Sequence, residues 1–429
     1  MCALRGLLGL LALLVAATMA ANTAGSECGD QYILMNKAMG CTGDPYCWSY
    51  LDPAAVTSEA FENVTRTFPA AAHSRRHLGL STQISVLDPA NSTYLAFLQR
   101  ILDMALLTKV PVAITLDPFE FWNWQAPYWN HWNQSQPGFN ASNCHHVEWT
   151  GFDCNTDATR IAWRDWGGQF RVAPHPNIAH PAVMALHRAA LAPAARLVAQ
   201  WYDRLTPDQH YLLAFVKPMW EVWIGTNYYV YPNATRYVNQ PASADPTGGV
   251  ADAVQVGFAA ICSRFNRCSG PPPTTAELDV IVREYGHALA TVFTEAGLPA
   301  FKLMGHNGVN WPELPPSQHN VTFNSAWAGL NNVTYPGFSF YHAAYNPGAA
   351  AQHLADVLTA SPRPCWGAAE WYYEGGNTGS RQEQWFAAFN NTMQNNNVLI
   401  DVFNWESFHR DPDAVAALNQ FLALADSSV

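Results

Sequence analysis

The sequence predicts an α/β protein that folds as a single (β/α)8 (TIM) barrel, with long Trp-rich loops at its C-terminal face. Apolar runs of strand length alternate with striped runs of helix length, and eight strands can be counted. Connections leading into strands are short, whereas those leaving the first, third, fourth and fifth strands are long. In such barrels the elaborated end is where chemistry takes place. A doubly wound open sheet is the alternative, but no GxGxxG or GxxxxGK(S/T) motif follows a predicted strand.

Each predicted strand is a short apolar run bounded by turn residues. The fourth follows the turn signal Thr206-Pro207-Asp208 and ends before Pro218, because proline cannot donate a hydrogen bond to a sheet. The eight predicted strands are Gln31–Lys37, Leu78–Val86, Val110–Leu116, Tyr211–Val216, Phe301–Met304, Phe338–His342, Cys365–Ala369 and Val398–Phe403.

The predicted helices carry apolar residues at helical spacing, and some begin with a capping residue. Asn91-Ser92 offers a cap to the second helix, and Thr275 to the fourth, which has Glu277 in its first turn. The segments from Asp117 to about Ile178 and from Lys217 to Pro273 are predicted as long loops. Helices are expected at Thr57–Phe68, Ser92–Leu107, Pro181–Leu205, Thr274–Ala296, Ala349–Thr359, Arg381–Met393 and Pro412–Ala425, with a weaker one at Ser325–Leu330.

The N-terminus has the pattern of a secretory signal peptide. Arg5 supplies a positive charge, Gly6–Met19 an apolar stretch, and Ala20, Ala21 and Ala24 small residues at cleavage positions. We therefore expect residues 1–24 to be the signal and residues 25–429 a single catalytic domain, secreted or lysosomal. No later apolar run reaches that length, so no membrane span is predicted.

Cysteines and glycosylation motifs agree with export. Without Cys2, eight cysteines remain, an even number typical of disulfide-bonded secreted proteins. The absence of a CxxC motif favours disulfides over zinc. Cys144 and Cys154 are close enough in sequence to form a local bridge, as are Cys262 and Cys268. The sequence does not fix the pairing of the other four, Cys28, Cys41, Cys47 and Cys365. For Cys365, a free buried thiol is an alternative. Sequons predict a partly occupied glycoprotein and begin at Asn63, Asn91, Asn133, Asn140, Asn233, Asn320, Asn332 and Asn390.

The charge pattern excludes two classes of partner. The net charge is −11, only 13% of residues are charged, and no basic block is present, which argues against nucleic acid and anionic membranes. No cofactor or metal is predicted either. His145-His146 lacks a third ligand at a recognisable spacing, so these histidines are expected to be solvated loop residues.

Two acidic residues near strand ends carry the functional hypothesis. Glu221 follows the fourth strand and Glu370 ends the seventh, and these positions face each other across the mouth of a closed barrel. Two opposed carboxyl groups are what glycoside hydrolysis requires, and a separation of about 5–5.5 Å gives retention of configuration. Aromatic walls around Glu221 suit a general acid, and Tyr341 or His342 could keep Glu370 ionised for attack.

Aromatic and polar residues at the same end of the barrel form the expected substrate-binding surface. Indole rings can stack on the apolar faces of sugars, and interleaved polar side chains can bind their hydroxyl groups. The expected substrate-binding residues are Asp117, Glu120, Trp122, Trp124, Asn227, Tyr228, His306, Asn307, Tyr341, His342, Trp371, Tyr372, Asn404 and Trp405.

With these features the chain resembles the clan A superfamily of retaining glycoside hydrolases. The resemblance covers nearly the whole mature chain and consists of eight strands, Glu after strand four, Glu then an aromatic at strand seven, and Trp after strand eight. It implies Glu221 as acid/base, Glu370 as nucleophile and Trp405 as part of the sugar-ring wall. One position departs: that group usually has Asn before the acid/base Glu, where it binds the sugar 2-hydroxyl, and here the residue is Trp220.

The first functional hypothesis is therefore a metal-independent retaining glycosidase acting on an oligosaccharide, polysaccharide or glycoconjugate. Two alternatives stay open: a non-catalytic carbohydrate-binding barrel, and a hydrolase of another class on the same fold. Plainer interpretations of single residues also remain. Glu221 could be a rim carboxylate paired with Lys217 or an arginine, Glu374 rivals Glu370, and packing of the long loops is an alternative role for many tryptophans.

Overall fold

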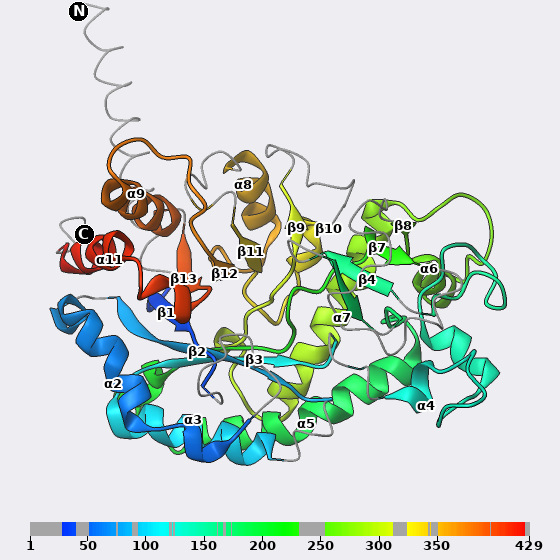
Figure 1. Cartoon of the computed structure of the whole chain (residues 1–429), viewed down its shortest axis with the longest axis horizontal. Helices are drawn as coiled ribbons and strands as arrows, with labels where there is room; N and C mark the ends of the chain where they lie inside the picture. The colour runs from blue at the N-terminus through cyan, green and yellow to red at the C-terminus, as the bar shows by residue number, and fades with distance from the viewer. Residues whose placement is uncertain are drawn as a thin grey trace, which may run out of the picture.

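The structure is a computed structural model that describes residues 28–39, 51–73, 76–87, 93–119, 122, 125–160, 162–165, 169–172, 174–230, 254–311, 324–341, 344, 351–394 and 396–424 (Figure 1). The expected signal peptide lies outside these residues. Cys41 and Cys47, whose pairing the sequence leaves open, lie outside them as well.

The centre of the molecule is a parallel sheet of seven strands that curls into a half-barrel (Figure 1). The strand order is β11-β12-β13-β1-β2-β3-β6, and each neighbouring pair is parallel. This confirms the α/β class and the parallel pairing, although the regular sheet has seven strands and does not close as eight. The strands are β1 (Tyr32–Asn36), β2 (His77–Ser85), β3 (Val112–Asp117), β6 (Leu213–Lys217), β11 (Gly337–Phe340), β12 (Trp366–Trp371) and β13 (Asn397–Val402).

The predicted fifth strand, Phe301–Met304, is wrong as a regular strand. Its first half belongs to the 3-10 helix η9 (Ala300–Lys302), which leaves too few extended residues for a ladder. What remains makes single parallel bridges, from Leu303 to Val216 of β6 and from Met304 to Tyr335, which precedes β11. The segment thus lies between the two edge strands of the sheet without forming a strand itself.

Close backbone approach at this segment depends on glycine. A Cβ atom added to Gly337 of β11 would lie 2.0 Å from the carbonyl oxygen of Gly305, a distance that real Cβ contacts do not show. Beyond it, Asn307 donates its backbone N–H to the Gly337 carbonyl at 3.0 Å and accepts from the Ser339 N–H at 3.0 Å. The backbone after Met304 is therefore fixed against β11.

Helices pack on the outer face of the curled sheet, with α2 against β2, α3 against β3 and α9 against β13 (Figure 1). Helix α5 is long and apolar enough to cross a membrane by length and composition alone. It packs beside α3 and α7 with nine buried residues, as a core helix does. The main helices are α2 (Ser58–Thr67), α3 (Tyr94–Thr108), α5 (Pro181–Asp203), α7 (Thr275–Glu295), α8 (Ala351–Ala360), α9 (Arg381–Met393) and α11 (Pro412–Ala423).

Several element boundaries differ from the sequence prediction for local reasons. Helix α7 is capped by Thr274, not Thr275, because Thr274 and Glu277 form a reciprocal capping box. Strand β6 starts later than predicted, because the 3-10 helix η7 (Pro207–Leu212) precedes it. The weak helix predicted around Ser325–Leu330 is a 3-10 turn, η11 (Ala326–Gly329).

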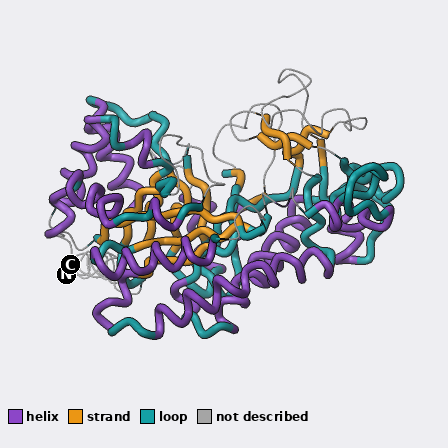
Figure 2. The backbone as a smooth tube through the Cα atoms, turned by 60° about the horizontal axis from the view of Figure 1, so that its bottom comes forward, coloured by secondary structure: helices purple, strands orange, loops and turns teal. Residues whose placement is uncertain are grey.

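The two long loops form a second, antiparallel sheet that the sequence did not predict. It has the order β5-β4-β7-β8, and in Figure 2 its strands lie apart from the main sheet. Strands β4 and β5 come from the loop after β3, and β7 and β8 from the loop after β6, so the β4–β7 pairing joins the two loops. The strands are β4 (Ala162–Asp165), β5 (Gln169–Val172), β7 (Thr226–Val230) and β8 (Val254–Gln255), and the short helices of these loops are α4 (Ala126–Trp129) and α6 (Phe258–Phe265).

Three disulfides cross-link the described residues. Cys144–Cys154 and Cys262–Cys268 are the two local bridges that the sequence allowed. Cys28–Cys365 joins the segment before β1 to the start of β12, so the free thiol considered for Cys365 is wrong. Disulfides of this kind are consistent with an oxidising compartment.

Replacing Cys28 and Cys365 together with alanine is expected to lower the free energy of unfolding by about 2–5 kcal/mol. The bridge joins positions 337 residues apart, so its loss releases a large loop in the unfolded chain. Urea unfolding followed by circular dichroism measures the change. The matched control is the pair Cys262 and Cys268, only 6 positions apart, whose replacement should cost less. Equal losses for the two pairs would contradict the prediction.

Candidate active site

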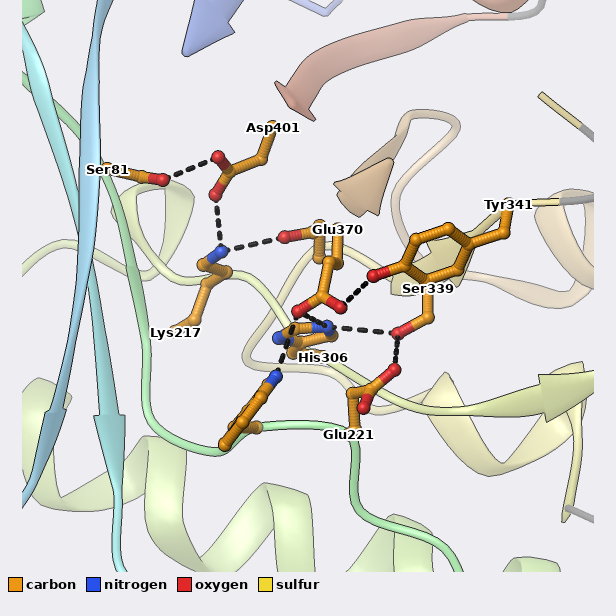
Figure 3. Close-up of polar contacts among 10 residues, drawn as sticks. Ser81, Lys217, Glu221, His306, Ser339, Tyr341, Glu370 and Asp401 are labelled. Carbon is orange, nitrogen blue, oxygen red and sulfur yellow. Dashed lines mark hydrogen bonds and ion pairs between the residues drawn. The ribbon is translucent and has the colours of Figure 1, made fainter. Parts of the chain in front are cut away.

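The curl of the sheet brings two buried glutamates together. Glu370 lies on β12 and Glu221 lies shortly after β6, and four strands separate β12 from β6 in the sheet. In a flat sheet they would be about 24 Å apart at the usual strand spacing. Instead, one carboxylate oxygen of each and one ring nitrogen of His306 all lie within 4.8 Å of one another (Figure 3). Both glutamates are buried, with 7% of Glu221 and 5% of Glu370 exposed.

Glu370 is held by two hydrogen-bond donors. The Tyr341 hydroxyl donates to Oε1, and the Trp220 indole Nε1 donates to Oε2 at 2.9 Å (Figure 3). Burial and the nearby Glu221 raise the pKa of Glu370 above its usual range, while these two donors and the charge of Lys217 lower it. Burial, followed by the charges of the two glutamates, raises the pKa of Tyr341 far above its usual range, so its hydroxyl remains a donor. The net effect raises the pKa of Glu370 to about 8, so the two donors and Lys217 offset the effect of burial only in part.

Glu221 is bonded to a hydroxyl that His306 orients. The Ser339 hydroxyl donates to Glu221 Oε1 at 2.6 Å, and His306 Nε2 lies 3.1 Å from the same hydroxyl oxygen. Burial, and then the charge of Lys217, holds the pKa of His306 well below its usual range, so the ring is neutral. The Ser339 hydroxyl donates its hydrogen to Glu221, so toward His306 its oxygen can only accept. His306 therefore carries its proton on Nε2 and donates it to Ser339.

The backbone at Glu221 is strained and pinned. Its φ angle is +44°, a left-handed conformation that costs a non-glycine residue about 1–2 kcal/mol. Flanking contacts hold it: the Val222 N–H donates to the His306 carbonyl at 3.3 Å, and the Asn307 amide donates to the Val222 carbonyl at 3.3 Å. Strain held in this way is found at functional sites, and here it aims the Glu221 side chain at Ser339.

The plainer interpretations of the two glutamates do not fit these contacts. Lys217 forms its ion pair with Asp401, at 2.6 Å between Nζ and Oδ2. Glu374, the rival of Glu370, is exposed, whereas Glu370 is buried among donors. Both observations favour the pair that the strand ends predicted.

Among the expected substrate-binding residues, Tyr341 and His306 join the two glutamates, and Asn307 supports the backbone after Glu221. Asp117 is fully buried at the end of β3, where its Oδ1 accepts from the Phe119 N–H at 2.8 Å. Glu120, Trp124 and His342 lie outside the described residues. The side chains of Asn227 and Tyr228, on β7, also lie outside them.

Trp122 and Trp371 are buried and make packing contacts, and their expected contacts with sugar stay predictions. Trp122 is 1% exposed and donates its indole N–H to the Pro174 carbonyl at 2.9 Å. Trp371 is fully buried and donates to Thr392 of α9 at 3.2 Å. Successive strand residues point to opposite faces, so Trp371 faces the helices because its neighbour Glu370 faces inward. The ring of Tyr372 packs edge-on against Trp385 of the same helix.

The residues after β13 are also structural in their contacts. Asn404 caps the short helix α10 (Trp405–Phe408) by accepting from the Ser407 N–H at 3.0 Å. The Trp405 ring stacks on His409 at 4.9 Å between centroids and is 7% exposed. The place of Trp405 in a sugar-binding wall stays a prediction.

The sequence analysis did not predict several residues that the structure brings to the site. Ser339 lies two positions before Tyr341, and the strand period of two residues places both on the same face. Polar residues within otherwise apolar strands were a second signal of site residues, because such side chains point to the inside of the curled sheet. The missed residues are Ser81, Lys217, Trp220, Ser339 and Asp401.

The chemistry of the donors speaks against a metal ion between Glu221, His306 and Glu370. Their spacing alone would admit an ion. However, oxygens of both carboxylates accept hydrogen bonds from side chains, and Nε2 of His306 is occupied by Ser339. A second cluster around His145 contains Cys144 and Cys154, which are joined in a disulfide and are not available as thiolates.

Comparison with known proteins gives no family for the chain: no family model and no curated protein matches it. Its class is therefore defined by its fold and site, a curled parallel α/β sheet with a buried pair of glutamates at the strand ends.

Proposed function

We propose that the protein is a glycosidase that hydrolyses O-glycosidic bonds with retention of configuration. The observation that carries the proposal is the separation of Glu221 and Glu370, with one oxygen of each within 4.8 Å. Retaining enzymes place their carboxyl groups about 5–5.5 Å apart, whereas inverting enzymes need about 6.5–9.5 Å to admit a water. The contacts of Glu370 support its role as the ionised partner.

The proposed reaction has two steps. Glu370 attacks the anomeric carbon while Glu221 donates its proton to the leaving oxygen, which gives a glycosyl ester and a free alcohol. Glu221, now ionised, takes a proton from water, and the resulting hydroxide displaces Glu370 and releases the sugar. Ser339 keeps Oε1 of Glu221 occupied in both steps and so directs the transferred proton to Oε2. No metal or cofactor takes part.

The fold and location belong to the same proposal. The bridges of Leu303 and Met304 to the two edges of the sheet support a (β/α)8 barrel with this segment in the fifth strand position. The N-terminal signal pattern and the disulfides support a secreted or lysosomal glycoprotein acting on carbohydrate.

A panel of aryl glycosides, followed by NMR of the released anomer, tests the proposal. We expect release from at least one glycoside, a first-formed product with the configuration of the substrate, and full activity in the presence of a chelator. Inversion would contradict the assignment of Glu370, and activity lost to the chelator would indicate another class of hydrolase. Saccharide binding without turnover would indicate a carbohydrate-binding barrel.

A further inference from the structure

A buried lysine lies behind the glutamate pair. Lys217 is the last residue of β6 and is 1% exposed. Its ammonium donates to Asp401 Oδ2 at 2.6 Å and to the Ala369 carbonyl at 2.7 Å (Figure 3). Asp401 in turn accepts from the Ser81 hydroxyl at 2.5 Å. This network ties β2, β6, β12 and β13 together inside the curl of the sheet.

Such a pair needs a reason beyond stability. A buried ion pair is often no more stable than apolar side chains of the same volume, because both charges lose their hydration. Asp401 compensates the charge of Lys217, and burial raises the pKa of Asp401 against the opposing effect of that lysine. The second bond of Lys217 is the informative one, since the Ala369 carbonyl belongs to the peptide unit that leads into Glu370.

We propose that Lys217 is a positioning residue: its ammonium, anchored by Asp401 and bonded to the Ala369 carbonyl, fixes the strand of Glu370 toward Glu221 and places a positive charge near its carboxyl group. The electrostatic part concerns Glu370 alone. The catalytic consequence rests on the proposed glycosidase function. The strand that carries Glu370 is therefore fixed by a residue of β6, which Asp401 of β13 anchors.

The other groups around Glu370 do not supply this charge. His306 is neutral, because burial and Lys217 hold its pKa well below its usual range. Tyr341 is a neutral donor, and Trp220 is a donor without charge. Glu221 and, near Tyr341, Glu374 are acidic. Among these described neighbours Lys217 is the cation, and its charge opposes the rise that burial and Glu221 cause in the pKa of Glu370.

The test is the titration of Glu370, followed by NMR of protein with carbon-13 in its glutamate carboxyl groups. The Glu370 signal is assigned by its absence in Glu370→Gln. Lys217→Met removes the positive charge but leaves the buried Asp401 without its ion-pair partner. The main variant is therefore Lys217→Met/Asp401→Asn, which removes both charges of the pair. In both variants we expect the midpoint of Glu370 to rise by about one pH unit or more. A folded double variant with the wild-type midpoint would overturn the proposal.

A matched control removes a cation elsewhere. Arg381 pairs with Asp411 at 2.5 Å on the surface, where its side chain is 61% exposed. Arg381→Met should leave the midpoint of Glu370 unchanged, because exposed charges at a distance are screened. The wild-type protein gives a test that needs no variant: Glu370 must lose its proton before Glu221. The reverse order would overturn the proposal even if no Lys217 variant folds.

Activity gives a separate outcome. Glu370 attacks only when ionised, so a higher pKa moves the acidic limb of kcat/KM to higher pH by the same amount as the NMR midpoint. At a pH below that limb the rate falls about tenfold per unit. If the wild-type protein hydrolyses no glycoside, the proposed function fails while the NMR titration still decides the role of Lys217. A purely structural Lys217 would change stability and leave both midpoints in place.

Discussion

Replacing Glu370 with glutamine is expected to lower kcat by a factor on the order of 10⁴ or more, as loss of a nucleophile does. The amide cannot form the glycosyl ester, but it fits the site. Its oxygen can accept from the Trp220 indole, and its NH₂ can donate to the Tyr341 hydroxyl, which accepts as well as donates. The variant should therefore fold, and its melting temperature should remain close to that of the wild type.

Glu374→Gln is the matched control for this variant. It lies four residues further along the chain and makes the same chemical change at an exposed position, so it should keep near wild-type kcat. Turnover is measured on the best aryl glycoside, and folding by circular dichroism. An active Glu370→Gln protein would remove Glu370 from the mechanism.

Replacing Glu221 with glutamine should give a loss that depends on the leaving group. General acid–base catalysis contributes about 10²–10⁴-fold, and the acid matters most for alcohols that leave poorly. Aryl groups of low pKa leave without a proton, so with them the first step survives and the second step, which lacks its base, becomes slow. The glycosyl ester on Glu370 should then accumulate and appear as added mass in a spectrum of the intact protein.

The dependence on the leaving group separates catalysis from structure. Glutamine at 221 still accepts from the Ser339 hydroxyl, so the strained backbone there keeps its contact. An equal loss for good and poor leaving groups, with no added mass, would show that Glu221 is not the acid. Ser339→Ala is a useful companion, because it removes the contact and leaves the carboxyl group in place.

Features of the fold that depend on residues close together in the sequence were predicted well, and those that depend on distant residues were not. Helix α9 (Arg381–Met393) was predicted to the residue, because the signals of a helix are local, and the structure adds a cap at Ser380. Glu221 and Glu370 were found because strand ends in parallel sheets collect at one edge. The period of two along β12 opposes Trp371 to Glu370, and the sequence analysis, which named both as site residues, did not use that signal.

Signals spread over long distances were lost. The Cys28–Cys365 bridge joins positions 337 residues apart, which only the folded sheet brings together. The β4–β7 pairing combines strands from two loops, and neither loop predicts its partner. The segment at Leu303 looked like a strand because it is apolar, but a 3-10 turn uses up its first residues and leaves single bridges.

The β4–β7 pairing has a mechanical consequence for Glu221. That residue lies on the short stretch between β6, which belongs to the curled sheet, and β7, which belongs to the small one. Glu221 therefore sits at the junction of the two sheets, and the hydrogen bonds of Val222 with His306 and Asn307 are what keep its position independent of the small sheet.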